Sequence, residues 1–161
     1  MPRRLVIRPA SHHDSREFLD IHHRSVHGLA VRHYTPDIIK AWAPPVSDDD
    51  VRNFERNDDG EIRLIAELDG VAVGIGALVV VDAELRACYV SPEAARQGVG
   101  SAIVSEIERI AKTHGLTQLT VQASINAEPF YEALGYEVIE RGEHVLRGGQ
   151  AMAAVKMTKK L

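Results

Sequence analysis

Hydrophobic positions are spaced in two different ways along the chain, and the first way predicts helices. After a short apolar strand at residues 5–8, apolar side chains recur every three or four positions, which is the period of a helix buried on one face. Thr35 is a suitable N-cap, Pro36 suits a first helical position, and Pro44 forbids continuation. Helices are expected at residues 14–27 and 36–43, and a further helical turn is expected within residues 47–57.

From residue 61 onward the pattern changes to alternation and short apolar runs, which are typical of strands. Asp69 and Gly70 provide a hairpin turn between the first two runs, and Asp82 and Ala83 provide the next turn. Three antiparallel strands are therefore expected at residues 61–68, 71–81 and 84–90.

The last third of the chain combines both patterns. An amphipathic helix ends at His114 and Gly115, and the strands on either side of it should be parallel because a helix connects them. A short helix with Asn126 as its cap follows, Gly135 stops it, and two more strands complete the chain. These elements are expected at residues 99–113, 116–122, 127–134, 136–146 and 151–157.

Length and composition narrow the class of protein. The 161 residues fit a single domain, expected at residues 3–161, with a layered α/β (α+β) fold. The predicted sheet is central, mixed and mostly antiparallel, with about seven strands and about four flanking helices. A net charge of −4 and a pI near 6.0 give no reason to expect nucleic-acid binding. With one cysteine and no apolar run near the ~20 residues of a membrane helix, a cytoplasmic protein without membrane partners is expected.

The segment from Ala83 to Ile110 joins a strand, a turn containing Gly98 and Gly100, and a helix N-terminus. The first N–H groups of a helix lack intrahelical partners and carry the positive end of its dipole, so this turn is suited to a phosphate. Its sequence, RQGVGSA, lacks the third glycine of a dinucleotide loop and the Lys-Ser/Thr ending of a nucleoside-triphosphate loop. The alternative is a tight turn that only starts a helix.

This segment resembles motif A of the GNAT superfamily of N-acetyltransferases, in which the pattern Gln/Arg-x-x-Gly-x-Gly/Ala binds the pyrophosphate of acetyl-coenzyme A (acetyl-CoA). Gly98, Val99 and Gly100 match the second half of that pattern. Ala95 stands where the family usually has Gln or Arg, and Arg96 follows one residue later as a substitute charge.

A second resemblance lies at residues 126–138, NAEPFYEALGYEV, which are similar to motif B of the same family. Together the motifs imply a GNAT-like fold over nearly the whole chain and acetyl-CoA as co-substrate. In this family the pantetheine arm pairs with the fourth strand, and the pyrophosphate lies on the glycine turn. The implied binding residues are Cys88, Tyr89, Val90, Arg96, Gln97, Gly98, Val99, Gly100, Ser101 and Asn126.

The resemblance also implies two catalytic residues. Tyr131 matches the motif B tyrosine that protonates the departing thiolate, and Glu84 has the spacing of the glutamate base in the lysine-acetylating branch. A backbone N–H near Val90 is expected to stabilise the developing oxyanion. From the residues alone, Tyr131 could instead pack a helix against the sheet, and Glu84 could be a solvated charge at the start of a strand.

Histidines gather in the first predicted helices, but no metal is expected. His23 and His27 have the i, i+4 spacing that can bind a metal ion, yet no third ligand of defined spacing follows. His22 and His33 lie nearby, and a histidine in this region could orient or deprotonate an amine. Cys88 lies in an apolar strand, which favours an inert thiol over a nucleophile.

The sequence therefore predicts an N-acetyltransferase that moves the acetyl group of acetyl-CoA directly to a primary amine. The acceptor is left open between a small molecule, a peptide N-terminus and a lysine. A non-catalytic acyl-CoA binding or sensing module is the alternative, and a phosphate-binding protein unrelated to coenzyme A is a third reading. The hydrophobic final strands are compatible with a homodimer.

Overall fold

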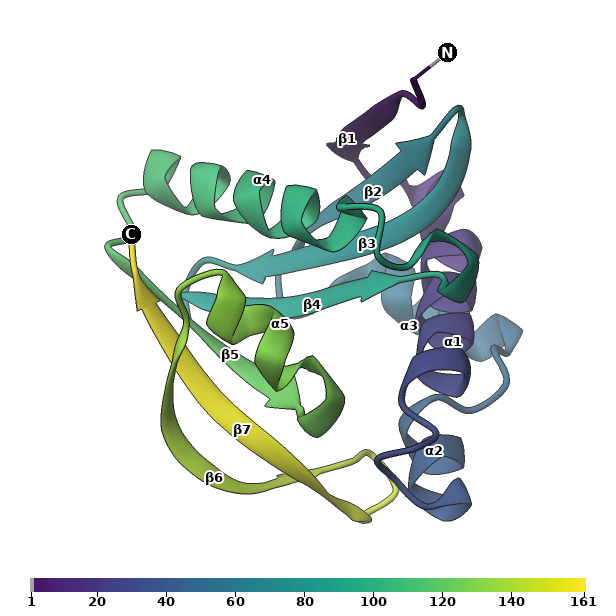
Figure 1. Cartoon of the computed structure of the whole chain (residues 1–161). Helices are drawn as coiled ribbons and strands as arrows, with labels where there is room; N and C mark the ends of the chain where they lie inside the picture. The colour runs from purple at the N-terminus through teal and green to yellow at the C-terminus, as the bar shows by residue number, and fades with distance from the viewer. Residues whose placement is uncertain (1) are drawn as a thin grey trace.

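Seven strands form one mixed sheet in the computed structural model, which describes residues 2–161 (Figure 1). The strand order is β1-β2-β3-β4-β5-β7-β6, and every neighbouring pair is antiparallel except β4 and β5. The predicted mixed, mostly antiparallel sheet is confirmed. The strands are β1 (Leu5–Pro9), β2 (Ile62–Leu68), β3 (Val71–Val79), β4 (Glu84–Val90), β5 (Gln118–Ser124), β6 (Glu137–Val145) and β7 (Ala151–Lys160).

Helices cover both faces of this sheet. The first and fourth helices pack against opposite faces of β3 and β4 (Figure 1). Residues 2–161 contain five α-helices, against the four or so expected, because the acidic segment before residue 57 forms a complete helix. No helix in this range is both long and apolar enough to span a membrane. The helices are α1 (Ser15–Leu29), α2 (Pro36–Trp42), α3 (Asp48–Arg56), α4 (Val99–Thr113) and α5 (Glu128–Ala133), with 3-10 turns η1 (His12–Asp14), η2 (Pro92–Ala94) and η3 (Ile125–Ala127).

Side-chain caps fix the starts of α2 and α3. The Thr35 hydroxyl accepts a hydrogen bond from the Ile38 N–H at 3.3 Å, so the predicted cap of α2 is confirmed. Ser47 and Asp50 form a reciprocal capping box at the start of α3. The Asp50 carboxyl has a lowered pKa, chiefly because its charged form accepts the Ser47 N–H bond.

The prediction that Asn126 caps the short helix near the C-terminus is wrong. Asn126 lies inside η3, and the N-cap of α5 is Ala127, whose side chain makes no capping bond. Pro129, in the first turn of α5, also lacks the N–H group that a cap would bind. The Asn126 side chain is therefore available for another role.

A β-bulge in β4 changes the direction in which its side chains point. The pairing with β3 shifts by one residue between Leu85 and Ala87, which leaves Arg86 as the extra residue. Leu85 and Cys88 consequently both pack against the core under α4, although they are three positions apart. Tyr89 packs on the other side, against the clusters under α1.

β4 and β5 are paired only where β4 begins. Glu84 and Thr120 form the single registered pair, and the Thr120 N–H donates to the Ala83 carbonyl at 2.9 Å. The two strands then diverge toward their carboxyl ends, as Figure 1 shows. A wedge thus opens in the middle of the sheet, in front of the N-terminus of α4.

Two glycines of β3 hold α4 close to the sheet. A Cβ atom at Gly76 would lie 2.5 Å from Cγ2 of Ile103, and one at Gly74 would lie 2.8 Å from its Cδ1. Ile103 is fully buried in this contact. The N-terminal half of α4, and with it the preceding turn, is therefore fixed against β3.

Candidate active site

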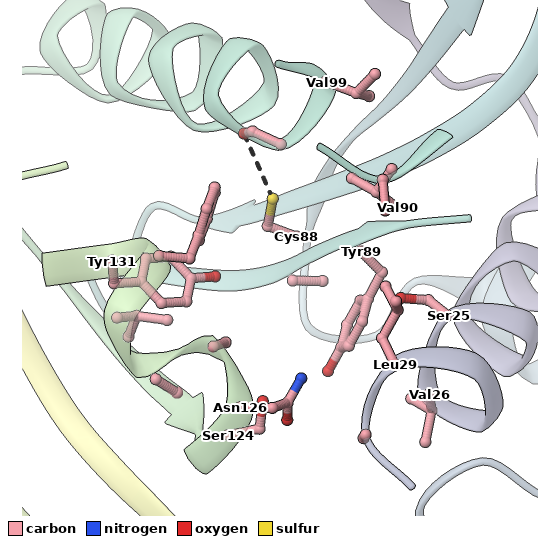
Figure 2. A pocket seen from close by; sticks show the side chains of 18 of the residues that line it. Ser25, Val26, Leu29, Cys88, Tyr89, Val90, Val99, Ser124, Asn126 and Tyr131 are labelled. Atoms are coloured by element: carbon pink, nitrogen blue, oxygen red, sulfur yellow. Dashed lines mark hydrogen bonds between the residues drawn. The ribbon is translucent and has the colours of Figure 1, made fainter. Parts of the chain in front are cut away.

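The wedge between β4 and β5 is a cleft of about 550 Å³ (Figure 2). Its walls come from both diverging strands, the turn before α4, the end of α1, and the η3–α5 segment. A cleft of this size is typical of a small-molecule site. Ten of the residues predicted from the sequence line it: Cys88, Tyr89, Val90, Arg96, Gly98, Val99, Gly100, Ser101, Asn126 and Tyr131.

The turn before α4 presents free backbone donors to one end of the cleft. Gly98 is the N-cap of α4 and has a left-handed backbone with φ of 80°. The Ala102 N–H donates to the Gly98 carbonyl at 3.1 Å, so the N–H groups of Val99, Gly100 and Ser101 precede the first intrahelical bond. These donors and the helix dipole favour an anion at this position.

Arg96 has a strained backbone beside these donors. Its φ is 61°, a left-handed conformation that costs a non-glycine residue about 1–2 kcal/mol. Ala95 lines the cleft without offering a charge, so Arg96 is the cationic side chain of this turn. Strain of this kind at a site is a reason to expect a function for the side chain.

We expect Arg96→Gly to raise the free energy of unfolding by about 1 kcal/mol and to weaken acetyl-CoA binding about fivefold. Relief of the left-handed strain explains the first effect, and loss of an exposed cation near the phosphates explains the second. Thermal unfolding and calorimetry measure the two effects. Ala83→Gly is the matched control, because Ala83 is also left-handed, with φ of 48°, but is not among the cleft-lining residues. Unchanged affinity in Arg96→Gly would restrict phosphate binding to the backbone.

The free edge of β4 supplies further donors. The Ser91 N–H donates to the Val73 carbonyl at 2.7 Å, on the β3 side. Because hydrogen-bonding direction alternates along an antiparallel pair, the Val90 N–H points the other way, toward the cleft. The same alternation directs the backbone of Cys88 to this edge.

Cys88 is a neutral thiol in this arrangement. Its Sγ donates to the Gly100 carbonyl at 3.7 Å, which joins β4 to the first turn of α4 (Figure 2). Burial raises the pKa of the thiol to about 12. A thiol with this pKa carries negligible thiolate near neutral pH, so Cys88 is not set up as a nucleophile.

Tyr131 directs its hydroxyl into the cleft from α5 (Figure 2). Its side chain is only 4% exposed, and its ring packs at 5.0 Å from the Phe130 ring and 5.5 Å from the Tyr136 ring. Burial raises its pKa well above the usual value near 10. The phenol is therefore neutral and able to donate a hydrogen bond across the whole physiological pH range.

Two predicted residues are not among those that line the cleft. Glu84 binds the side chain of Arg86 instead. Gln97 accepts a hydrogen bond from Arg3 at 3.0 Å and donates to the Glu93 carbonyl at 3.3 Å. The structure thus does not bring Glu84 together with Tyr131.

Asn126 lies across the cleft from β4, and its side chain extends toward Tyr89 (Figure 2). Its Oδ1 atom is buried and has no hydrogen-bond partner within residues 2–161. Buried polar atoms of this kind normally have a partner, so Asn126 is suited to a ligand in the cleft.

The residues that close the cleft opposite α4 could not be identified from the sequence. Trp42 and Leu29 line that side, and Tyr34 holds it in place. The Tyr34 hydroxyl donates to the Ala153 carbonyl at 2.6 Å and accepts from the Ile125 N–H at 2.8 Å. No local sequence signal marks these contacts, because they join segments more than 90 residues apart.

Two histidines of α1, His23 and His27, contact the C-terminal end of α2. His23 Nδ1 and His27 Nε2 contact the Ala43 carbonyl at 3.0 and 2.8 Å. Burial, with smaller contributions from these two neighbours, lowers the pKa of His22 to about 4. Within the part of the chain that the structure describes, no three His, Cys, Asp or Glu residues are grouped to hold a metal ion.

This combination of a wedge in a mixed sheet, a helix N-terminus and a phenol is the arrangement of an acetyltransferase of the GNAT type. A family model described as "Acetyltransferase (GNAT) domain" matches residues 30–161, more than half of the chain. The chain belongs to the GNAT acetyltransferase family, and it is an acyltransferase.

Individual relatives agree with this assignment. "Uncharacterized N-acetyltransferase YafP" of Escherichia coli (strain K12) is 29% identical over 135 residues, which cover 84% of this chain and 83% of that protein. A "GCN5-Related N-acetyltransferase: Aminotransferase, Class-II" from Rhodopseudomonas palustris is 31% identical, with a TM-score of 0.90 over 100% of this chain and 99% of the other. The yncA putative acetyltransferase from Salmonella typhimurium, solved with acetyl-CoA, shares the fold at 20% identity, with a TM-score of 0.71 over 98% and 94% of the two chains.

Proposed function

We propose that this enzyme transfers the acetyl group of acetyl-CoA directly to a primary amine. The observation that carries the proposal is that one cleft combines the free N–H groups of the α4 N-terminus, the free edge of β4 and the Tyr131 hydroxyl. That neighbours of the same fold were solved with acetyl-CoA or coenzyme A supports the choice of acyl donor.

The described donors fit the parts of acetyl-CoA in order. The pyrophosphate would lie on the N–H groups from Arg96 to Ser101, including those of Gln97, Gly98, Val99 and Gly100. The amides of the pantetheine arm would pair with the β4 edge at Cys88 and Val90, on either side of Tyr89, where β5 leaves the backbone unpaired. Asn126 would bind the same arm from the opposite wall, where its buried Oδ1 atom would accept a hydrogen bond.

The proposed reaction places two donors at the atoms that gain negative charge. Attack of the amine on the thioester carbonyl would form an oxyanion, and the Val90 N–H that points into the cleft would stabilise it by about 3 kcal/mol. Collapse would release the thiolate of coenzyme A, and Tyr131 would protonate it. The parent thiol has a pKa near 8.5. The Tyr131 hydroxyl would therefore stabilise the sulfur most strongly in the transition state, while negative charge develops on it.

Glu84 stays a prediction as the base that takes the proton of the amine. If it has this role, Glu84→Gln should lower kcat about tenfold at pH 7. Asp59→Asn is the matched control, since Asp59 also binds Arg86, at 2.9 Å, and is exposed. Equal effects of the two substitutions would assign Glu84 to holding Arg86 in place.

Calorimetry of acetyl-CoA binding, followed by thiol release with a panel of amines, tests the proposal. Binding with amine-dependent release is the expected result. Binding without release for every class of amine would favour the acyl-CoA sensing module. Absence of binding would overturn the assignment of the Gly98–Gly100 turn.

A further inference from the structure

The cleft has a second wall that the proposed acetyl-CoA position leaves free. If the acyl donor lies along the α4 turn and the β4 edge, the acceptor must lie between β4 and the α1–α2 side. We call this surface the acceptor wall. Its apolar and aromatic residues are Val26, Leu29, Ala30, Trp42 and Tyr89, and its polar residues are Ser25 and His33.

The acceptor wall is mostly apolar and aromatic, and the surrounding structure holds it in place. The Trp42 ring lies 6.2 Å from the Tyr89 ring and 5.6 Å from the Tyr34 ring, both edge-on. Tyr34 is in turn fixed by its two hydrogen bonds to β7 and η3. Burial raises the pKa of Tyr89 to about 12, so this wall carries no phenolate charge near neutral pH.

No side chain of this wall carries a permanent charge that could bind a second charge on the acceptor, and its histidine, His33, is exposed to solvent. No Asp or Glu of residues 2–161 is among those that line the cleft. Arg86 is a lining residue, but it already binds Asp59 at 2.9 Å and Glu61 at 3.6 Å, as well as Glu84. Arg96 belongs to the phosphate end of the cleft.

We infer that the acceptor is a primary amine on an apolar group about the size of an aromatic ring, with no second charge. This inference rests on the proposed function and names its substrate class. Polyamines and amino acids would place an ammonium or a carboxylate against the wall without a partner, which is costly. An apolar wall also lowers the pKa of a bound ammonium, because burial disfavours the charged form, and so favours the nucleophilic neutral amine.

Two pairs of acceptors test the inference by thiol release from the intact protein with saturating acetyl-CoA. 2-Phenylethylamine and phenylalanine share a ring and differ by a carboxylate. Butylamine and 1,4-diaminobutane share a chain and differ by a second ammonium. We expect the singly charged member of each pair to have the higher kcat/KM, by about tenfold or more. Equal or reversed values in either pair would overturn the inference.

A substitution at Leu29 tests the same point from the protein side. Leu29 is 39% exposed, so a polar side chain there can be hydrated. Leu29→Asp is compared with Leu29→Asn, which has the same shape but no charge. The Asp variant should have the higher kcat/KM for 1,4-diaminobutane and the lower kcat/KM for 2-phenylethylamine, each by about threefold to tenfold. The affinity for acetyl-CoA should be the same in both variants. Equal selectivity of these isosteric variants would overturn the assignment of the wall.

Failure of the inference and failure of the proposed function look different in these experiments. Thiol release restricted to polyamines, lysine peptides or amino acids would reject the apolar acceptor while confirming acetyl transfer. Acetyl-CoA binding with no release from any of these amines would reject acetyl transfer itself, and the acceptor class with it.

Discussion

Tyr131→Phe is expected to lower kcat about 100-fold while changing the Kd of acetyl-CoA by less than about twofold. The substitution removes only the hydroxyl, which points into the cleft, and keeps the ring that packs against Phe130 and Tyr136. If the hydroxyl donates to the departing thiolate, its interaction exists mainly in the transition state, so turnover should fall without a loss of binding. Steady-state thiol release and calorimetry measure the two quantities.

Tyr136→Phe is the matched control for this experiment. Tyr136 is also buried beside Tyr131, but its hydroxyl donates to the Glu108 carboxylate at 2.9 Å and is not part of the cleft. Its loss should reduce the free energy of unfolding by about 1–3 kcal/mol and leave kcat close to that of the wild type. If Tyr131→Phe also kept its turnover, Tyr131 would be only a packing residue.

Gly100→Val should weaken acetyl-CoA binding about 100-fold. A Cβ atom at Gly100 would lie 3.1 Å from two ring carbons of Phe130 and 3.7 Å from Cγ2 of Val90, so a valine side chain would add bulk among residues that line the cleft. Insertion of bulk into a fitted site costs about 1–3 kcal/mol, and about 1.4 kcal/mol corresponds to a factor of ten in affinity.

Folding should not explain that loss, and two further variants check this. Valine has a slightly better helix propensity than glycine, and Phe130 is only partly buried, so the Tm should stay within a few degrees. Ser105→Val places the same side chain on an exposed position of α4 and should bind acetyl-CoA normally. Gly100→Ala should fall between this control and Gly100→Val. Normal affinity in Gly100→Val would place the pyrophosphate elsewhere.

The elements of the fold follow from signals that are local in the sequence. Periodicity, the Thr35 cap and the Asp69-Gly70 turn depend only on nearby residues, and the structure confirms each of them. The glycine turn is equally local, because a left-handed Gly98 and a helix N-terminus need no distant partner. Most of the residues that line the α4 side of the cleft could therefore be predicted before the fold was known.

The residues on the α1–α2 side of the cleft could not be predicted, because their placement depends on contacts between distant segments. Tyr34 binds residues of η3 and β7 that lie far along the chain. The direction of Glu84 also depends on a non-local feature, the bulge at Arg86. An unbroken strand would direct Glu84 to the same face as Cys88, whereas the bulge reverses this relation. Sequence spacing alone does not reveal such a reversal.

The sheet consists of two halves that are joined at β4 and β5 by a single registered pair, Glu84 and Thr120. One half-sheet contains β1 to β4 and the other contains β5, β7 and β6, and over most of their common edge no backbone ladder joins them. A molecule bound across this seam would contact both halves at once. Binding there would join the two half-sheets, so the ligand-free enzyme should be more flexible than the ligand-bound enzyme.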